Sequence, residues 1–138
     1  MNSYQEATRI RIELIVGRLQ HRLNMDGWWT ITHRYLEGHD GDETVDDDGE
    51  KSIYGTTAIT TASWEYRTAT IRWFMPVAAL QSDEELELTA IHELVHVLLW
   101  PIYEVLPGEQ KYKGIDKLNE YTTECIARVI HSAMRGGA

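Results

Sequence analysis

The chain has 138 residues, 43% of them hydrophobic and 25% charged, and its 13 basic and 22 acidic side chains give a formal net charge of −9. At about 100–200 residues per domain, this length predicts a single domain over residues 1–138, and the negative charge argues against a nucleic-acid partner. The single cysteine excludes an intrachain disulfide bond and any zinc site that needs two cysteines from one chain. Because the sequence has neither a run of about 18 apolar residues nor a recognisable signal peptide, we expect no membrane partner and a cytoplasmic location.

The N-terminal half of the chain predicts one helix followed by three strands. Residues 3–24 carry apolar side chains at three- and four-residue spacings, which is typical of an amphipathic helix. Apolar and polar side chains alternate over residues 28–36 and 68–75, and residues 53–64 are rich in β-branched side chains, so we expect a strand in each segment. A short connection at residues 65–67 would join the last two strands into a hairpin. We therefore expect a small, mostly antiparallel, three-stranded sheet.

An acidic insertion at about residues 38–51 separates the first predicted strand from the second. The run Thr44–Gly49 resembles half of an EF-hand calcium loop, but the first and twelfth loop positions would be Thr44 and Gly55, where calcium needs Asp and Glu. We therefore expect a solvated loop without a calcium site. The acidic residues of this insertion are Asp40, Asp42, Glu43, Asp46, Asp47, Asp48 and Glu50.

Two helices are predicted in the C-terminal half. Ser82 followed by Glu85 is a capping-box pattern that predicts a helix start, and Pro101 predicts that this helix ends at about Trp100. Because the helix is apolar on nearly every side before its end, we expect it at the centre of the fold. Residues 116–134 predict a last helix. The expected fold class is therefore α+β, with an N-terminal helix, the sheet and two C-terminal helices, and we expect the five tryptophans in the core.

The residues from His92 to His96 form an HExxH pattern within the predicted central helix. On a helix, positions i and i+4 lie one turn apart on one face, so both imidazoles can bind one zinc ion at about 2.0–2.1 Å. Glu93 is then placed to accept a proton from a metal-activated water. The alternative interpretation is a pair of hydrogen-bonded core histidines, although two unpaired histidines and a glutamate would be costly in a buried helix.

A catalytic zinc site keeps three protein ligands and one open position, so we expect a third ligand downstream. Glu120 and Glu124 are four residues apart on the last predicted helix and share one face. If Glu120 binds the metal, Glu124 can hydrogen-bond the far nitrogen of a ligand histidine; Glu124 as the ligand, or two solvated glutamates, are the alternatives. Cys125 points about 100° away from Glu124 and is expected to be buried. Further candidates are Glu104, Glu109 and Asp116, whereas His131 lies more than about 10 Å beyond Glu124 along the helix axis.

The two segments together resemble the gluzincin metallopeptidases, which combine HExxH on a zinc-binding helix with a glutamate ligand in an Asn-Glu context on a later helix. The second segment here is Asn119-Glu120, followed four residues later by Glu124. Over residues 52–135, size and element order are similar to the small single-domain forms, the minimal and phage-type zincins. The resemblance implies a zincin-like fold, Zn2+ held by His92, His96 and Glu120, Glu93 as the catalytic general base, and Glu124 as the support of a ligand histidine.

The resemblance also implies a peptide or protein substrate that pairs by its backbone with a strand at residues 56–64 or 68–74. Larger family members carry a second subdomain whose histidine or tyrosine stabilises the oxyanion. This sequence has no such subdomain, and Tyr103, Tyr112 and Tyr121 are the candidate substitutes. The expected function is therefore a zinc-dependent metallopeptidase that hydrolyses peptide bonds. The alternative is a zinc-binding regulatory or interaction protein that has this fold and no peptidase activity.

Overall fold

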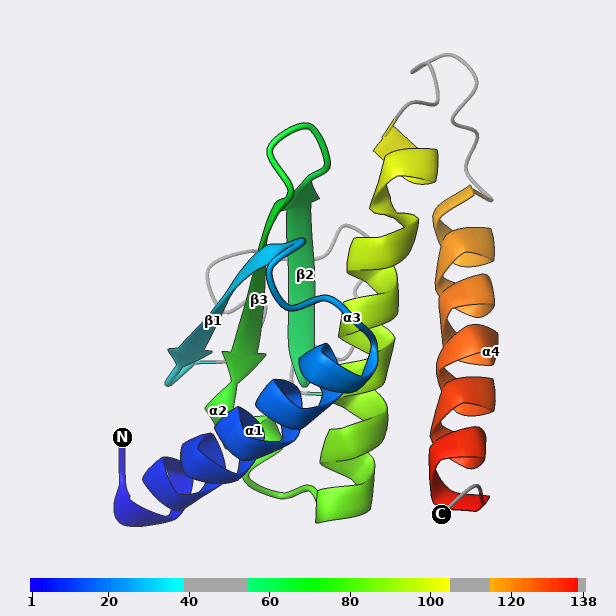
Figure 1. Cartoon of the computed structure of the whole chain (residues 1–138). Coiled ribbons are helices and arrows are strands. Elements are labelled where there is room, and N and C mark those ends of the chain that lie inside the picture. The colour runs from blue at the N-terminus through cyan, green and yellow to red at the C-terminus, as the bar shows by residue number, and fades with distance from the viewer. Residues whose placement is uncertain (39–54, 105–114, 137–138) are drawn as a thin grey trace.

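The structure is a computed structural model that describes residues 1–38, 55–104 and 115–136 (Figure 1). It has the α+β architecture expected from the sequence, with a helix before the sheet and further helices after it. Nearly all of the acidic insertion at residues 38–51, with its calcium interpretation, lies outside the described residues. The elements in chain order are α1 (Ser3–Arg22), β1 (Thr30–Leu36), β2 (Ala58–Ser63), β3 (Thr68–Phe74), α2 (Met75–Ala78), α3 (Asp83–Glu104) and α4 (Ile115–Gly136).

The three strands form a mixed sheet in the order β1-β3-β2. β2 and β3 make the predicted antiparallel hairpin, in which Thr60 lies opposite Ile71. β1 runs parallel to β3, with Thr30 opposite Thr68, so the prediction of a mostly antiparallel sheet is wrong for this strand. Alternation along a strand indicates which face is buried but carries no information on strand direction. A parallel pair needs a connection of about a dozen residues or more, and the chain between β1 and β3 exceeds that length.

The predicted start of α3 is confirmed and its predicted end is wrong. The amide of Glu85 donates to the Ser82 hydroxyl at 3.1 Å, and the amide of Ser82 donates to the Glu85 carboxylate at 3.2 Å, which is the reciprocal capping box. The helix continues through Pro101 to Glu104. A proline in the last turn removes one backbone donor, and the other hydrogen bonds of that turn still hold the helix together.

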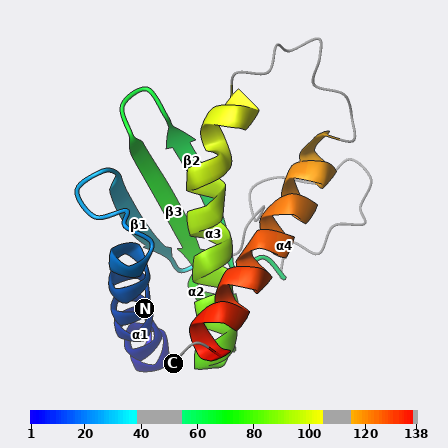
Figure 2. The same ribbon diagram turned by 45° about the vertical axis from the view of Figure 1, so that its right-hand side comes forward.

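α3 is the central element of the fold, as predicted, and lies between the sheet and α4 in both views (Figures 1 and 2). It packs against β2, α1 and α4. The tryptophan prediction is wrong at two positions, because Trp73 is fully buried whereas Trp28 and Trp64 are 64% and 39% exposed. No described helix is both long enough and apolar enough to cross a membrane. Five side chains of α3 are completely inaccessible to solvent: Leu86, Ala90, Ile91, Leu94 and Val97.

Candidate metal centre

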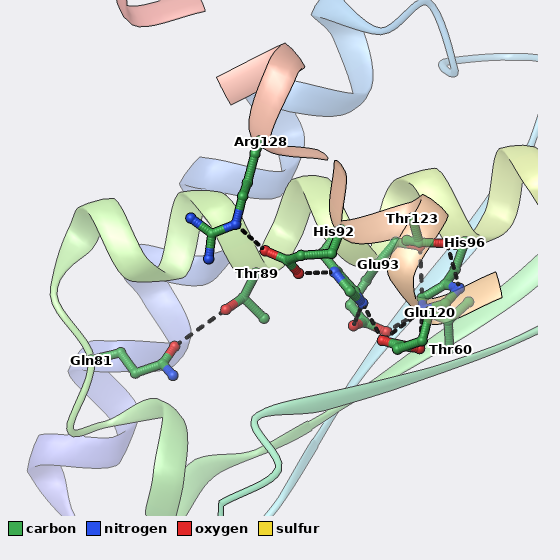
Figure 3. A network of polar contacts seen from close by, with 10 residues as sticks. Thr60, Gln81, Thr89, His92, Glu93, His96, Glu120, Thr123 and Arg128 are labelled. Atoms are coloured by element: carbon green, nitrogen blue, oxygen red, sulfur yellow. Dashed lines mark hydrogen bonds and ion pairs between the residues drawn. The ribbon is translucent and has the colours of Figure 1, made fainter. Parts of the chain in front are cut away.

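Two neighbouring helices bring the predicted metal ligands together (Figure 3). The one-turn spacing on α3 places the imidazole rings of His92 and His96 with their centroids 4.8 Å apart. Glu120 reaches them from α4, with one carboxylate oxygen 2.6 Å from His92 Nε2 and the other 3.1 Å from His96 Nε2. One ligand atom from each of the three residues lies within 4.8 Å of the other two, so this group could hold a metal ion.

Glu124 contacts the opposite side of the His92 ring. One oxygen of its carboxylate lies 2.6 Å from His92 Nδ1, and the other lies 2.9 Å from Arg128 Nε. Glu124 is therefore outside the group that could hold a metal, and of the two glutamates it is Glu120 that lies between the histidines. A carboxylate at Nδ1 orients the ring and leaves Nε2 directed at Glu120.

Thr123 is a neighbour of the site that the sequence analysis missed. It is fully buried, and its hydroxyl lies 3.5 Å from His96 Nδ1. The signal in the sequence is its place three residues after Glu120, which puts both residues on the same side of α4. Both histidines of the site thus have a polar α4 side chain beside Nδ1.

Glu93 lies on the side of α3 that faces the sheet, and it is only 5% exposed. Oε1 of its carboxylate accepts a hydrogen bond of 2.7 Å from the hydroxyl of Thr60 on β2, while Oε2 lies 4.0 Å from His92 Nε2. Burial raises the pKa of Glu93, and the Thr60 hydrogen bond and the two histidines oppose this effect. Thr60 was not identified from the sequence, because nothing in a threonine-rich strand indicates which hydroxyl faces a helix.

The electrostatics of the site favour positive charge between the two helices. Burial lowers the pKa of His92, but the hydrogen bond to Glu120 and the carboxylates of Glu93, Glu120 and Glu124 outweigh burial and raise it to about 9. The hydrogen bonds from His92 and His96 hold the pKa of Glu120 well below its usual range. The same carboxylates around the two histidines favour binding of a metal cation. Such a cation would replace the proton in the hydrogen bonds between the histidines and Glu120.

A cavity of about 250 Å³ opens beside these groups, and Glu93 lines it together with His92 and Glu120, two of the three candidate ligands. Two of the lining threonines are held by Gln81: its amide donates to the Thr57 hydroxyl at 2.7 Å, and its carbonyl oxygen accepts from the Thr89 hydroxyl at 3.4 Å (Figure 3). A molecule in this cavity would reach the general-base candidate and the metal position together. The lining residues are Thr57, Ala58, Leu88, Thr89, His92, Glu93, Glu120 and Glu124.

The other sequence candidates lie elsewhere or outside the described residues. His131 lies 3.6 Å from Glu87 and accepts a hydrogen bond from Arg135, away from the site as expected. Cys125 is exposed, which corrects the prediction of a buried thiol, since among the described residues it lies on the side of α4 that also carries exposed Tyr121 and Val129. Exposed Glu104 ends α3 and is not part of the group of described residues that could hold a metal ion. Glu109 and Tyr112 are outside the described residues, as are the side chains of Tyr103 and Asp116.

Two imidazole nitrogens and one carboxylate oxygen form a donor set that suits several divalent transition metals. Three such ligands leave at least one coordination position open, and Glu93 and the adjacent cavity lie beside the group. No protein-family model, no curated protein and no solved structure matches this chain.

Proposed function

We propose that the protein is a zinc-dependent metallopeptidase with a zincin-like fold, in which His92, His96 and Glu120 bind Zn2+ and Glu93 is the general base. The observation that carries the proposal is the position of the Glu93 carboxylate. It lines one cavity together with His92 and Glu120, two of the three candidate ligands, and has an oxygen 4.0 Å from His92 Nε2. A carboxylate beside an open metal position is the arrangement that hydrolysis by an activated water requires.

The donor set supports zinc as the metal. Zinc commonly takes imidazole nitrogen and carboxylate oxygen from three protein ligands in catalytic sites. The contact between Glu124 and His92 Nδ1 fits the carboxylate–histidine pairs that orient such ligands. When bound, zinc supplies Lewis-acid chemistry, polarising a carbonyl group and lowering the pKa of water to about 7.

Glu93 provides the proton transfers of the proposed reaction. Its carboxylate takes a proton from the attacking water and later gives it to the nitrogen of the leaving amine. Burial raises the pKa of Glu93 and thereby its basicity, which suits an acid–base catalyst that must both accept and release a proton.

The sheet supports an extended peptide as the substrate. β3 pairs with a strand on each side, so residues 68–74 have no free edge for a substrate. Among the described residues β2 pairs only with β3, and Thr57 and Ala58 at its start line the cavity. We therefore assign substrate pairing to the β2 segment, because an unpaired strand edge binds extended peptides through backbone hydrogen bonds.

The proposal is tested with the variant Glu93→Gln, with Glu84→Gln as the control. Glu84 is an exposed glutamate in the first turn of the same helix. We expect Glu93→Gln to retain one zinc per chain and to hydrolyse a peptide library at least about 100-fold more slowly than the wild type. Glu84→Gln should match the wild type in both zinc content and rate. An unaltered rate in Glu93→Gln would exclude the mechanism.

One observation favours the alternative of a zinc-binding regulatory protein. Of the three tyrosines considered from the sequence as oxyanion-stabilising groups, Tyr121 is the one whose side chain is described, and it is 69% exposed and not among the residues that line the cavity. Zinc binding by the wild type without chelator-sensitive hydrolysis of any peptide would select this alternative.

A further inference from the structure

Glu93 and Thr60 form a buried polar contact between α3 and the edge strand β2. Their side chains are only 5% and 7% exposed, and they are two of the four buried polar side chains in the described part of the chain. The Thr60 hydroxyl lies 2.7 Å from Oε1 of Glu93 and 3.4 Å from the backbone carbonyl oxygen of the same residue. Its single proton therefore goes to the carboxylate, which is the nearer and the charged acceptor.

This contact gives the two oxygens of Glu93 different surroundings. Oε1 is held by Thr60, whereas Oε2 lies 4.0 Å from His92 Nε2, beside the candidate ligands. The last torsion of a glutamate side chain is broad, so a carboxylate without a partner samples many orientations. A hydrogen bond to one oxygen restricts that rotation and fixes the direction in which the other oxygen points.

The strand supplies a rigid donor for this purpose. Thr60 is paired with Ile71 in the hairpin, and its β-branched side chain has restricted rotation at χ1. Thr61, the next residue, points to the opposite face of the sheet and is exposed. Thr57 and Ala58 of the same segment line the cavity, so one segment contacts both the cavity and the general base.

We infer that Thr60 is a positioning residue, whose hydroxyl holds Oε1 of Glu93 so that Oε2 faces the metal position. The inference rests on the proposed function, since it assumes that Glu93 acts on a reactant held beside the metal ligands. In this role the side chain of Thr60 contacts neither the substrate nor the metal, and acts only through Glu93, whereas the proposed substrate pairing uses the backbone of β2.

The kinetic test compares Thr60→Val, Thr60→Ser and the matched control Thr32→Val in the zinc-loaded protein. Because misplacement of a reacting group by about 1 Å can cost about 100-fold in rate, we expect Thr60→Val to lower kcat about 10- to 100-fold. KM and zinc content should stay within about threefold of the wild type, since the side chain of Thr60 touches neither substrate nor metal and the substitution leaves the backbone of β2 unchanged. Thr60→Ser keeps the hydroxyl and should restore kcat to within about threefold. Thr32→Val removes the hydroxyl of an exposed threonine on β1 and should leave kcat unchanged.

Equal losses of kcat in Thr60→Val and Thr60→Ser would overturn the inference, because the hydroxyl would then not be the group that matters. Thermal unfolding of each variant shows which ones are folded. If Thr60→Val does not fold, Thr60→Ala, which also lacks the hydroxyl, takes its place in the comparison with Thr60→Ser.

A crystallographic readout separates this inference from the proposed function. Crystal structures of the zinc-loaded wild type and Thr60→Val should show that the Glu93 carboxylate leaves its wild-type orientation in the variant. An unmoved carboxylate would overturn the inference even if the wild type is an active peptidase. A wild type that hydrolyses no peptide, with a Glu93 carboxylate that moves in Thr60→Val, would refute the proposed function and leave the contact between Thr60 and Glu93 established.

Discussion

The ring of His92 is held at both nitrogens: Nδ1 lies 2.6 Å from a carboxylate oxygen of Glu124, and Nε2 lies 2.6 Å from one of Glu120. These two glutamates are one helical turn apart on α4, so one helix face supplies both contacts. The two contacts have different consequences. Glu120 also reaches His96, whereas Glu124 is in turn held by Arg128. The orientation of His92 is therefore set by a chain of polar contacts along α4.

The support given by Glu124 predicts a loss of metal affinity when it is removed. Glu124→Ala should weaken zinc binding by about 10- to 100-fold, because loss of a hydrogen-bonded partner leaves the ligand imidazole free to rotate and less basic. Competition with a chelating indicator measures this affinity. Glu65→Ala, which removes an exposed glutamate in the turn between β2 and β3, is the control. Equal affinities of Glu124→Ala and Glu65→Ala would contradict the prediction.

Zinc should stabilise the folded protein through Glu120. A ligand that binds only the folded state at 1,000 times its Kd adds about 4 kcal/mol to the free energy of unfolding. We expect zinc to raise the free energy of unfolding of the wild type by this order in denaturant unfolding. Adding a chelator should abolish this increase. Glu120→Ala removes one of the three candidate ligands and should lose most of the gain. A zinc response in Glu120→Ala equal to that of the wild type would show that Glu120 is not a ligand.

His33 on β1 predicts a pH dependence of stability that is independent of the metal site. Its Nδ1 accepts a hydrogen bond from Trp73 at 3.1 Å, and its Nε2 lies 2.8 Å from the side-chain carbonyl oxygen of Gln20, so the neutral ring satisfies both partners. Burial lowers its pKa from 6.5 to about 4, with a small opposing effect of Glu13. Between pH 6.5 and about 4 the unfolded chain therefore binds a proton at His33 that the folded chain does not bind.

The contribution of His33 to the free energy of unfolding should be fully present above pH 6.5. It should fall progressively as the pH drops to 4, by up to about 3 kcal/mol. In denaturant unfolding, the free energy of unfolding of His33→Gln should decrease less between pH 7 and pH 4.5 than that of the wild type. His21→Gln is the control, because His21 is exposed and contacts only Asp26 among its described partners. Parallel pH profiles for the wild type and His33→Gln would contradict the assigned pKa.

The central place of α3 predicts unequal costs for two leucines on this helix. Leu86 is fully buried, whereas Leu98 is 43% exposed. Leu86→Ala leaves a cavity in the core and should lower the free energy of unfolding by about 2–5 kcal/mol. Leu98→Ala should cost less than about 1 kcal/mol, as expected for a surface position. Similar costs in urea unfolding would show that α3 does not have the packing described.

Much of the secondary structure could be predicted from local sequence. The capping box at Ser82 and Glu85 places the start of α3, and the apolar spacing predicts α1 over nearly its observed length. The end of α3 was mispredicted, since Pro101 removes only one backbone donor and the helix continues past it to Glu104. The direction of β1 was also mispredicted, because strand pairing depends on residues far apart in the chain.

In the candidate site, too, some relationships between residues follow from local sequence and others depend on the tertiary structure. The sequence by itself determined that His92 and His96 share a helix face, because a four-residue spacing and the pitch of a helix suffice for that. Only the tertiary structure decided that Glu120, and not Glu124, lies between the two rings, and that Thr60 reaches Glu93. Contacts within a helix follow from its geometry, whereas contacts between α3, α4 and β2 depend on how the packed core sets these elements against one another.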